Sequence, residues 1–365
     1  MIQPLIYPHT LPPAVGQMQA VAPGVFWIRV PLPWVLDHVN VYALEDADGW
    51  TVIDTGLDTP DTRALWHALL QGPLGQKPVR RVIVTHHHPD HVGLAGWFQA
   101  QGAELWMPRT GWLMARMMVL DDQPLPLPQT LDFWHAAGMD ADQLAAKAQQ
   151  RPTNYSDMVC PLPLGYRRLQ QGDMLDLAGR RWQVHMGHGH APEHATLWSE
   201  DGTIVIGGDQ LLPSISPNLG VYATEPDADP VGEWLESCSR LKHLATQTQL
   251  VLPGHKLPFS GLLTRLGQLE ANHFETLDRL YDHLVQPQTA VACFPALFRR
   301  KIGASNYGLA LVEAVAHLNH LYQAGRITRQ RDTRGVWQWQ QTPVTVATAD
   351  VSARKSDDWP RDSAI

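Results

Sequence analysis

The densest group of metal-competent side chains is the segment His86–His91, which reads HHHPDH. His86 and His88 are two positions apart, so an extended or looped backbone can aim both imidazoles at one point. Asp90 and His91 are then available to a second point nearby. Packing such side chains together costs free energy unless a ligand binds them, because they lose hydration and their charged forms repel one another. The segment therefore predicts a metal site rather than a chance surface cluster.

Further ligand candidates follow later strand-like runs of the sequence. One tight cluster cannot complete the shells of two metal ions, so more ligands must come from elsewhere in the chain. In each case a glycine precedes the candidate, as expected where the backbone turns sharply or approaches a site closely. Loops at one end of a sheet are a rigid place for such side chains. The candidates are His190 in GHAPEH, Asp209 in GGD and His255 in PGH.

Alternating strand-like and helix-like segments surround these candidates and predict a layered α/β body. Short apolar runs interrupted by turns fit strands, and apolar residues at helical spacing after a Thr-Pro start fit a helix. Strands are expected at 39–44, 50–53, 81–85, 182–186, 195–199, 203–206 and 249–252, and helices from Pro60 and over about 231–244 and 261–284.

Residues 109–165 interrupt this alternation and indicate an insertion that folds over the body and forms part of the pocket. They hold a stretch rich in Met and Trp at 112–118, a proline-rich segment at 122–129 and a helical segment around 131–150. The Met and Trp side chains favour ordinary core packing, and the alternative is an adaptable wall of a substrate pocket.

The C-terminal part of the chain forms a second unit with a basic character. Residues 285–341 contain seven basic and two acidic side chains, which gives +5 there and −13 for the rest of a chain of net charge −8. A helix at 309–323 and a two-stranded ribbon at 327–339 resemble a winged helix. We therefore expect a catalytic domain over 1–260, a helical, winged-helix-like domain over 261–341 and a frayed tail over 342–365.

Composition narrows the class of protein further. The chain has 365 residues, of which 44 % belong to the apolar AVILMFWYC set, so it can bury a sizeable core. No apolar run reaches the ~18 residues of a membrane helix, and the N-terminus lacks the order of a secretion signal, so a cytoplasmic protein is expected. Three cysteines far apart rule out a disulfide framework.

The apolar C-terminal helices can pack on the body or on a second copy, as a homodimer.

In this order, the motifs H-x-H-x-D-H, G-H-x-P-x-H, G-D and G-H resemble those of the metallo-β-lactamase superfamily of binuclear metallohydrolases. Asn40–Tyr42 and Ile53–Gly56 resemble the opening strands and the buried aspartate of that family. The similarity covers roughly residues 20–260, apart from the insertion. It implies an α/β fold in which helices cover two facing sheets, the αββα metallo-β-lactamase sandwich, with metal ions at one edge of the sheets.

The resemblance also assigns ligands to two divalent metal ions. Zinc is the best candidate for a mixed set of imidazoles and carboxylates, and iron or manganese would also fit. Asp90 is expected to be catalytic as well, by orienting the nucleophile while it binds metal. Carried over position by position, the resemblance implies His86, His88 and His190 for one ion, Asp90, His91 and His255 for the other, and Asp209 as a bridge.

Other polar side chains near these motifs are expected to support the site rather than bind metal. Asp54 would fix the cluster loop by hydrogen bonding, and His194 would orient the loop that carries His190. His87 is expected to point away from the ions, and His188 fits a structural place better than a ligand position.

Two residues are candidates for contact with the substrate. Lys256, next to the last ligand, would attract a substrate anion, and an ordinary solvated lysine is the alternative. Tyr222 is a candidate to stabilise a developing oxyanion, and packing is the favoured alternative.

The implied ligand set indicates hydrolysis of a small molecule. Two ions would hold a bridging water as hydroxide, which would attack the carbonyl of a small ester, thioester, lactone or β-lactam. A protein nucleophile is not needed, and the sequence contains no G-x-S-x-G motif. The aromatic and methionine content of the insertion suits an enclosed, partly apolar pocket.

Two other functions stay open at this point. The C-terminal region resembles that of a lactamase-like branch of the superfamily, which includes hydrolases similar to glyoxalase II and an endoribonuclease. A metal-dependent endoribonuclease or phosphodiesterase would hold nucleic acid with the basic domain, although the acidic remainder of the chain opposes this. A ligand-sensing DNA-binding regulator is the third alternative, but the predicted recognition helix carries few basic side chains to reach bases.

Overall fold

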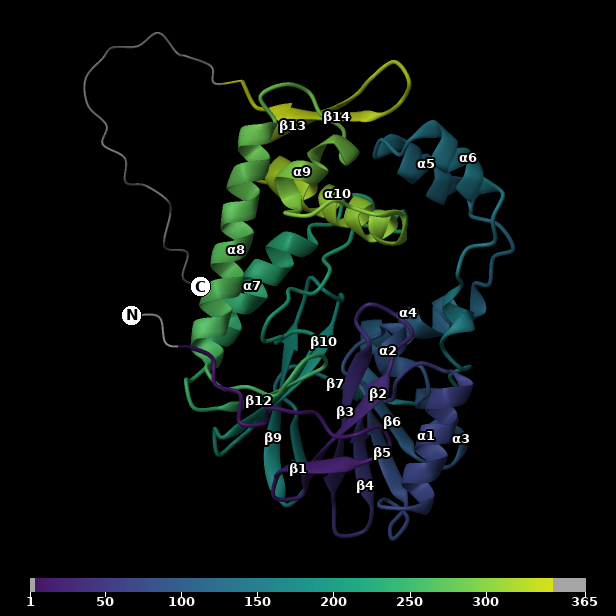
Figure 1. Cartoon of the computed structure of the whole chain (residues 1–365), viewed down its shortest axis with the longest axis vertical. Helices are drawn as coiled ribbons and strands as arrows, with labels where there is room; N and C mark the ends of the chain where they lie inside the picture. Colours follow the sequence, from purple (N-terminus) through teal and green to yellow (C-terminus); the bar gives the residue numbers. More distant parts are fainter. Residues whose placement is uncertain (1–3, 344–365) are drawn as a thin grey trace, which may run out of the picture.

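The computed structural model describes residues 4–343 and shows two β-sheets packed face to face, with helices on both outer sides (Figure 1). The larger sheet consists, in spatial order, of β1 (Met18–Ala22), β2 (Val25–Pro31), β3 (His38–Glu45), β4 (Trp50–Ile53), β5 (Val79–Ile83), β6 (Glu104–Pro108) and β7 (Arg167–Leu169). The first four strands are antiparallel, whereas β4 to β7 run parallel.

The smaller sheet consists, in spatial order, of β12 (Leu250–Pro253), β11 (Ile204–Gly208), β10 (His194–Ser199), β9 (Arg180–Gly187) and β8 (Met174–Leu177). β11 and β12 are parallel, and the other neighbours are antiparallel. β9, β11 and β12 therefore all point the same way, and their carboxyl ends meet at one edge of the sheet.

Central strands are buried on both faces, which explains their nearly continuous apolar sequences. Along β3, Tyr42 and Leu44 face the smaller sheet, whereas Val41 and Ala43 face the outer helices. Large side chains from both sheets fill the layer between them, among them Trp27, Trp182, Ile206 and Leu252. This burial on two sides confirms the predicted αββα sandwich.

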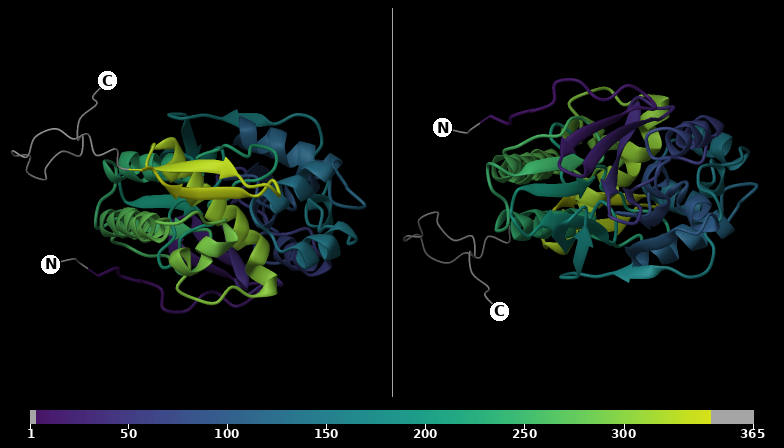
Figure 2. Two further views of the ribbon diagram at one scale, coloured as in Figure 1. Left: turned by 90° about the horizontal axis from the view of Figure 1, so that it is seen from above. Right: turned by 90° about the horizontal axis from the view of Figure 1, so that it is seen from below.

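Helices cover the outer face of each sheet (Figures 1 and 2). In chain order, the helices of the described residues are α1 (Pro60–Gln71), α2 (Pro89–Val92), α3 (Ala95–Ala100), α4 (Arg109–Leu120), α5 (Pro128–Ala136), α6 (Ala141–Ala148), α7 (Pro230–Lys242), α8 (Leu262–His283), α9 (Phe294–Leu297) and α10 (Tyr307–Gln323). Of these, α5, α6 and α9 lie near the C-terminal strands instead of on a sheet face (Figure 1). Trp66 of α1 and Phe98 of α3 meet edge to face, 4.9 Å between ring centroids, above the larger sheet. Trp234 of α7 and Leu266 of α8 lie in the core that covers the smaller sheet.

The insertion at 109–165 belongs to two neighbourhoods rather than one. In α4, Trp112 is buried on the body and stacks on Tyr166 with 4.6 Å between ring centroids, which is the packing role favoured for this stretch. In α5, Phe133 instead packs against Trp337 of the C-terminal part, with 5.9 Å between ring centroids. The middle of the insertion, around α5, therefore packs on the C-terminal part (Figure 1), whereas its end, with Tyr155, returns to the core of the body. The expected part of the insertion in the pocket stays a prediction.

The helical segment expected around 131–150 is two helices, α5 and α6. Gly138 lies between them with φ at 91°, a backbone conformation that favours glycine. A Cβ atom there would also overlap the side chain of Thr289 in the C-terminal part. Asp140 then begins α6 by accepting hydrogen bonds from the backbone N–H groups of Asp142 and Gln143.

The C-terminal part is helical and ends in a small two-stranded sheet, as expected. β13 (Ile327–Arg331) pairs antiparallel with β14 (Trp337–Gln341). Its core is continuous with that of the body, because Trp234 of α7, Leu311 of α10 and Trp339 of β14 belong to one apolar cluster. The winged-helix comparison and the domain boundaries at 260 and 341 stay predictions. Of the expected tail, residues 344–365 lie outside the described part.

Two expectations from composition concern membranes and disulfides. Within residues 4–343, every helix is too short or too polar to cross a membrane. Cys160, Cys238 and Cys293 are all buried and free, in agreement with the predicted lack of a disulfide framework. Burial raises the pKa of Cys293 to about 12, so this thiol stays protonated and packs as a small apolar group.

A stack of buried histidines joins α8 to α10 and should make the protein sensitive to acid. The rings of His273 and His317 lie 5.8 Å apart between centroids, and both side chains are buried. Burial lowers the pKa of His273 to about 3 and that of His317 to about 4. Both stay neutral in the folded protein while the unfolded chain takes up protons near ~6.5, so stability falls as the pH drops below that value.

Replacing His273 with phenylalanine should remove its share of this acid sensitivity. At pH 5 a histidine kept neutral by folding costs about 2 kcal/mol of stability. Among residues 4–343, no group forms a hydrogen bond with either ring nitrogen of His273, so phenylalanine breaks no bond there. Urea unfolding at pH 7 and pH 5 should therefore show a smaller loss of unfolding free energy in His273→Phe than in the parent protein. Equal losses in the two proteins would contradict this assignment.

Candidate metal centre

The residues that the motifs single out follow the carboxyl ends of strands from both sheets. His86 comes three residues after β5, and His190 three residues after β9. Asp209 directly follows β11, and His255 comes two residues after β12. Because these strand ends meet at one edge of the sandwich, the fold brings together side chains that are far apart in the sequence.

Three histidines form one half of the cluster. His88 Nδ1 lies 3.0 Å from His86 Nε2 and 2.9 Å from His190 Nε2. Three ring nitrogens therefore converge on one point, and they meet the spacing expected of ligands to a single ion. This is the grouping that the resemblance implied for the first ion.

The other half combines imidazoles with carboxylates. Asp90 Oδ2 lies 3.7 Å from His91 Nε2 and 3.4 Å from His255 Nε2. Asp209 lies between the two halves: its Oδ2 is 3.2 Å from His255 Nε2 and 3.4 Å from His190 Nε2, and its Oδ1 is 3.4 Å from His91 Nε2. Asp209 thus faces both halves of the cluster, and its bridging of two ions stays a prediction.

Hydrogen bonds fix the orientation of four of these five imidazoles. In each of the four, Nδ1 faces an acceptor, so Nδ1 carries a proton and Nε2 faces the cluster. His88 differs, because its Nδ1 faces the cluster. The acceptors are Thr85 Oγ1 for His86 (2.9 Å), Asp54 Oδ2 for His91 (2.8 Å), Asn218 O for His190 (2.9 Å) and His38 O for His255 (2.7 Å).

Electrostatics separate the two halves of the cluster. Burial and the neighbouring imidazoles hold the pKa of His86 and His88 well below the ordinary value, so both rings are neutral and their lone pairs are free. Burial alone would lower the pKa of His255, but Asp209 and Asp90 outweigh it and raise the value to about 10. The carboxylates thus concentrate negative charge where a cation would be held.

Buried atoms without partners show that the donor set fits divalent metal ions. His91 Nε2 and Asp209 Oδ1 are buried and make no hydrogen bond within the described residues, a costly state that ligation would relieve. Gly254 lets β12 reach the cluster, since a Cβ atom there would overlap Asp209 Oδ1 and crowd His91. Imidazole and carboxylate ligands of this kind suit zinc, iron or manganese.

Asp54 lies beneath the cluster loop, where the sequence placed it. Its φ is 60°, and it accepts hydrogen bonds from Thr85 N at 2.8 Å and Thr85 Oγ1 at 2.9 Å. Because Asp54 captures the Thr85 N–H, β5 ends at Ile83 rather than at the expected residue 85, and the loop turns toward the metal ligands. Its Oδ2 also accepts from His91 Nδ1.

His194 and His87 lie beside the cluster without joining it. His194 Nε2 accepts a hydrogen bond from the backbone N–H of Asp209 at 3.0 Å, so this nitrogen is not free for metal. His194 thus orients the residue after β11 rather than only its own loop. His87 is buried, and its backbone carbonyl accepts a hydrogen bond from the hydroxyl of Tyr155.

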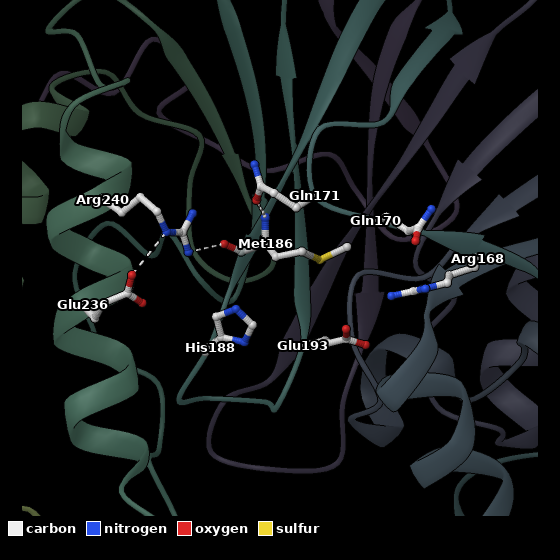
Figure 3. Close-up of a pocket in the computed structure, with 8 residues that line it drawn as sticks. All are labelled: Arg168, Gln170, Gln171, Met186, His188, Glu193, Glu236 and Arg240. Carbon is white, nitrogen blue, oxygen red and sulfur yellow. Dashed lines mark hydrogen bonds and ion pairs between the residues drawn. The ribbon is translucent and has the colours of Figure 1, made fainter. Parts of the chain in front are cut away.

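His188 lies outside the cluster, in agreement with the structural place expected for it. Its Nδ1 lies 2.6 Å from Pro192 O, and its backbone N–H donates to Ser237 Oγ at 3.0 Å. Figure 3 shows His188 lining a pocket of about 430 Å³ together with Glu193 from the same loop and Arg240 from α7. None of the candidate metal ligands lines this pocket.

The two candidate substrate residues are not part of the cluster. The backbone N–H of Lys256 donates to His38 Nε2 at 2.9 Å, and its φ of 70° re-aims the chain directly after His255. Tyr222 is 51 % exposed, and its hydroxyl makes no hydrogen bond within the described residues. Contact of either side chain with substrate stays a prediction.

Several residues that support the cluster were not predicted from the sequence. The backbone carbonyl of His38 holds the ring of His255, and the ring of His38 accepts a hydrogen bond from the backbone N–H of Lys256. In the sequence, a histidine at the start of a strand gives little indication of such a role. Tyr155 comes from the insertion, and Asn218 from a loop without regular structure. The capping pattern from Asn154 to Asp157 predicts a helical turn but not its partner.

Two facing sheets that gather buried imidazoles and carboxylates at one edge are typical of metal-dependent hydrolases, and this places the protein in that class. The sequence model of the Metallo-beta-lactamase superfamily matches residues 34–255, and that of the metallo-beta-lactamase-like C-terminal domain matches residues 277–342. The chain belongs to the metallo-beta-lactamase superfamily, and it is a metallohydrolase of that family.

Similar proteins share most of the chain. A beta-lactamase domain protein from Burkholderia ambifaria is 38 % identical with a TM-score of 0.85, over 93 % of this chain and 98 % of that one. The Bacillus subtilis protein named probable metallo-hydrolase YqjP is 28 % identical over 83 % of this chain and 94 % of its own length. A chicken protein named acyl-coenzyme A thioesterase MBLAC2 is 26 % identical over 68 % of this chain and 83 % of its own length.

Proposed function

We propose that the protein is a binuclear metallohydrolase that adds water to the carbonyl carbon of a small ester, thioester, lactone or β-lactam and breaks the bond from that carbon to the leaving oxygen, sulfur or nitrogen. The observation that supports this most is the convergence of the three-histidine group and the carboxylate group on Asp209, which faces both. In this proposal His86, His88 and His190 hold one ion, and Asp90, His91 and His255 hold the other. Zinc is the metal that we favour.

Divalent ions held there would activate water at neutral pH and polarise the substrate carbonyl. The residues of the chain supply orientation and charge. The imidazoles of His91 and His255 outweigh burial and keep the pKa of Asp90 below its ordinary value, so this carboxylate stays ionised and can accept a hydrogen bond from the attacking water. His194 holds the backbone N–H of Asp209, which keeps that carboxylate between the two groups.

Among the carbonyl compounds, we place thioesters first. Similarity to a protein named as an acyl-coenzyme A thioesterase supports this order, since that relative is matched over most of its own length. A Pseudomonas protein named linear primary-alkylsulfatase is also similar, at 24 % identity, but this chain spans only 41 % of that relative. Alkyl sulfates therefore belong in the substrate panel as a competing outcome.

Hydrolysis of nucleic acid is less well supported, because several of the seven basic side chains of the C-terminal part pair with carboxylates of the protein. The guanidinium of Arg329, besides its ion pair given below, lies over the ring of Trp337, 5.0 Å from the ring centroid, and covers apolar surface there. Paired guanidinium groups are poorly placed to neutralise phosphates. The ion pairs are Arg326 with Asp278 (3.4 Å), Arg329 with Asp227 (2.8 Å) and Arg334 with Asp332 (2.9 Å).

A parallel assay tests the proposal. The zinc-loaded protein is incubated with an acyl thioester, a lactone, a chromogenic cephalosporin, an alkyl sulfate and a 5′-labelled RNA. We expect about two ions per chain by metal analysis, and cleavage of a carbonyl substrate that His88→Ala abolishes. Cleavage of RNA or alkyl sulfate alone, lost in His88→Ala, would overturn the proposed substrate class.

A further inference from the structure

One of the proposed ligands is held by a path that starts in the C-terminal helix α10. Glu313 of α10 accepts a hydrogen bond from Asn218 Nδ2 at 2.7 Å. The backbone carbonyl of the same Asn218 faces His190 Nδ1 at 2.9 Å. On its other side, His190 Nε2 lies 2.9 Å from His88 Nδ1. A carboxylate from the second unit is thus connected to the three-histidine group through one loop residue.

The loop that carries Asn218 takes its shape from the C-terminal helices. Residues 212–229 leave the cluster after Asp209 without forming a helix or strand. Arg265 of α8 donates to Leu212 O at 2.7 Å and to Ile215 O at 2.9 Å. The backbone N–H of Val221 donates to Val312 O of α10 at 3.1 Å, and Asn319 of α10 donates to Pro226 O and Ala228 O at 2.9 and 3.0 Å.

The other oriented imidazoles receive their support from the body. His86 and His91 depend on Thr85 and Asp54, which follow β5 and β4, and the carbonyl that holds His255 comes from β3. Loss of the α10 contact should therefore affect the three-histidine group and leave the carboxylate group unchanged. This difference makes the contact testable.

Glu313 is a costly residue to keep at this position. Burial raises the pKa of Glu313 to about 7, and the hydrogen bond from Asn218 offsets this only partly. An apolar side chain of similar size would pack in α10 without that cost. Asn218 is the residue whose side-chain amide satisfies the carboxylate within the described residues, so the pair fixes the direction of the Asn218 carbonyl.

We propose that Glu313 is a positioning residue for the metal ligand His190, acting through Asn218, so that the C-terminal unit sets the affinity of the three-histidine site. The proposal rests on the proposed ligand role of His190. It does not depend on the substrate, because metal binding is measured without one. Removing such a partner of a ligand typically weakens metal affinity roughly 10- to 100-fold.

The test is a titration of the metal-free, full-length protein with Co²⁺, whose visible absorption distinguishes a site with three imidazoles from a site with two imidazoles and an additional carboxylate. We expect Glu313→Ala and Asn218→Ala each to weaken the three-histidine site at least about tenfold and to leave the other site within twofold. Glu313→Gln keeps an acceptor oxygen for the Asn218 amide and should restore most of the affinity. The double variant should be no worse than either single one, because both break the same path.

Asn319→Ala is the matched control, since it loosens the same loop from the same helix but has no path to His190. It should lower the unfolding temperature without changing either Co²⁺ affinity. Equal weakening of both sites in Glu313→Ala, unchanged affinities in that variant, or an equal loss in Asn319→Ala would each overturn the proposal. If the parent protein bound no pair of ions, the proposed function itself would fail, which is a separate result.

Discussion

Asp209→Ala should lower the rate of hydrolysis on the order of 10³-fold and reduce the metal content below two ions per chain. Asp209 faces His190, His91 and His255 at 3.2 to 3.4 Å, so it is the residue shared by both halves of the cluster. Removing its carboxylate takes a ligand from each proposed site at once. It also lets the pKa of His255 fall from about 10, since Asp209 is the largest influence that raises it.

Two further variants serve as comparisons for the metal content and activity of Asp209→Ala. Asp209→Asn keeps the shape of the side chain but offers one oxygen instead of two, so we expect a metal content between those of the parent and Asp209→Ala. His185→Ala removes an imidazole of β9 that faces Trp198 and lies outside the cluster, and it should retain both ions and full activity. Metal analysis and steady-state kinetics check all three proteins. An Asp209→Ala protein with two ions and full activity would refute the bridging role.

Local motifs predicted the centre of the site better than its surroundings. The order of glycines, histidines and aspartates identified the residues that the fold gathers, because a ligand cluster after each strand is a local pattern. His38, Tyr155 and Asn218 support that cluster from distant segments, and each makes its contact through a backbone carbonyl or an ordinary hydroxyl or amide. Such contacts leave no spacing in the sequence, so only the folded chain shows them.

The same limit explains the errors in the expected fold. Strands and helices with strong periodicity, such as β4, α8 and α10, lie within a few residues of their predicted positions. The packing of α5 was not predicted because an apolar helix face does not specify its partner, and Phe133 packs near Trp337, which lies 204 positions away. Whether α5 packs on the body or on the C-terminal part depends on tertiary contacts, which the local sequence does not contain.

Asp54→Asn should destabilise the protein and weaken the second proposed metal site, although the two side chains have nearly the same shape. All three partners of the Asp54 carboxylate donate hydrogen bonds: Thr85 N, Thr85 Oγ1 and His91 Nδ1. Whichever way an asparagine amide is turned, its NH₂ group faces at least one of these donors inside the core. A buried donor left without an acceptor costs about 1–3 kcal/mol, and His91 loses the bond that fixes its Nε2 toward the cluster.

Urea unfolding of the metal-free protein should therefore show a loss of about 2–3 kcal/mol, and Co²⁺ titration should show roughly 10- to 100-fold weaker binding at the carboxylate site. Asp46→Asn is the matched control: Asp46 also accepts from a threonine, Thr51 Oγ1, and from a backbone N–H, that of Ala178. It follows β3 at the strand end opposite His38, and no proposed ligand is among these partners. The control variant should lose stability without losing metal affinity. If both variants weakened metal binding alike, the effect would come from general loosening of the sandwich. If only Asp54→Asn did so, the hydrogen bond to His91 would be the cause, because that bond is what distinguishes the two aspartates.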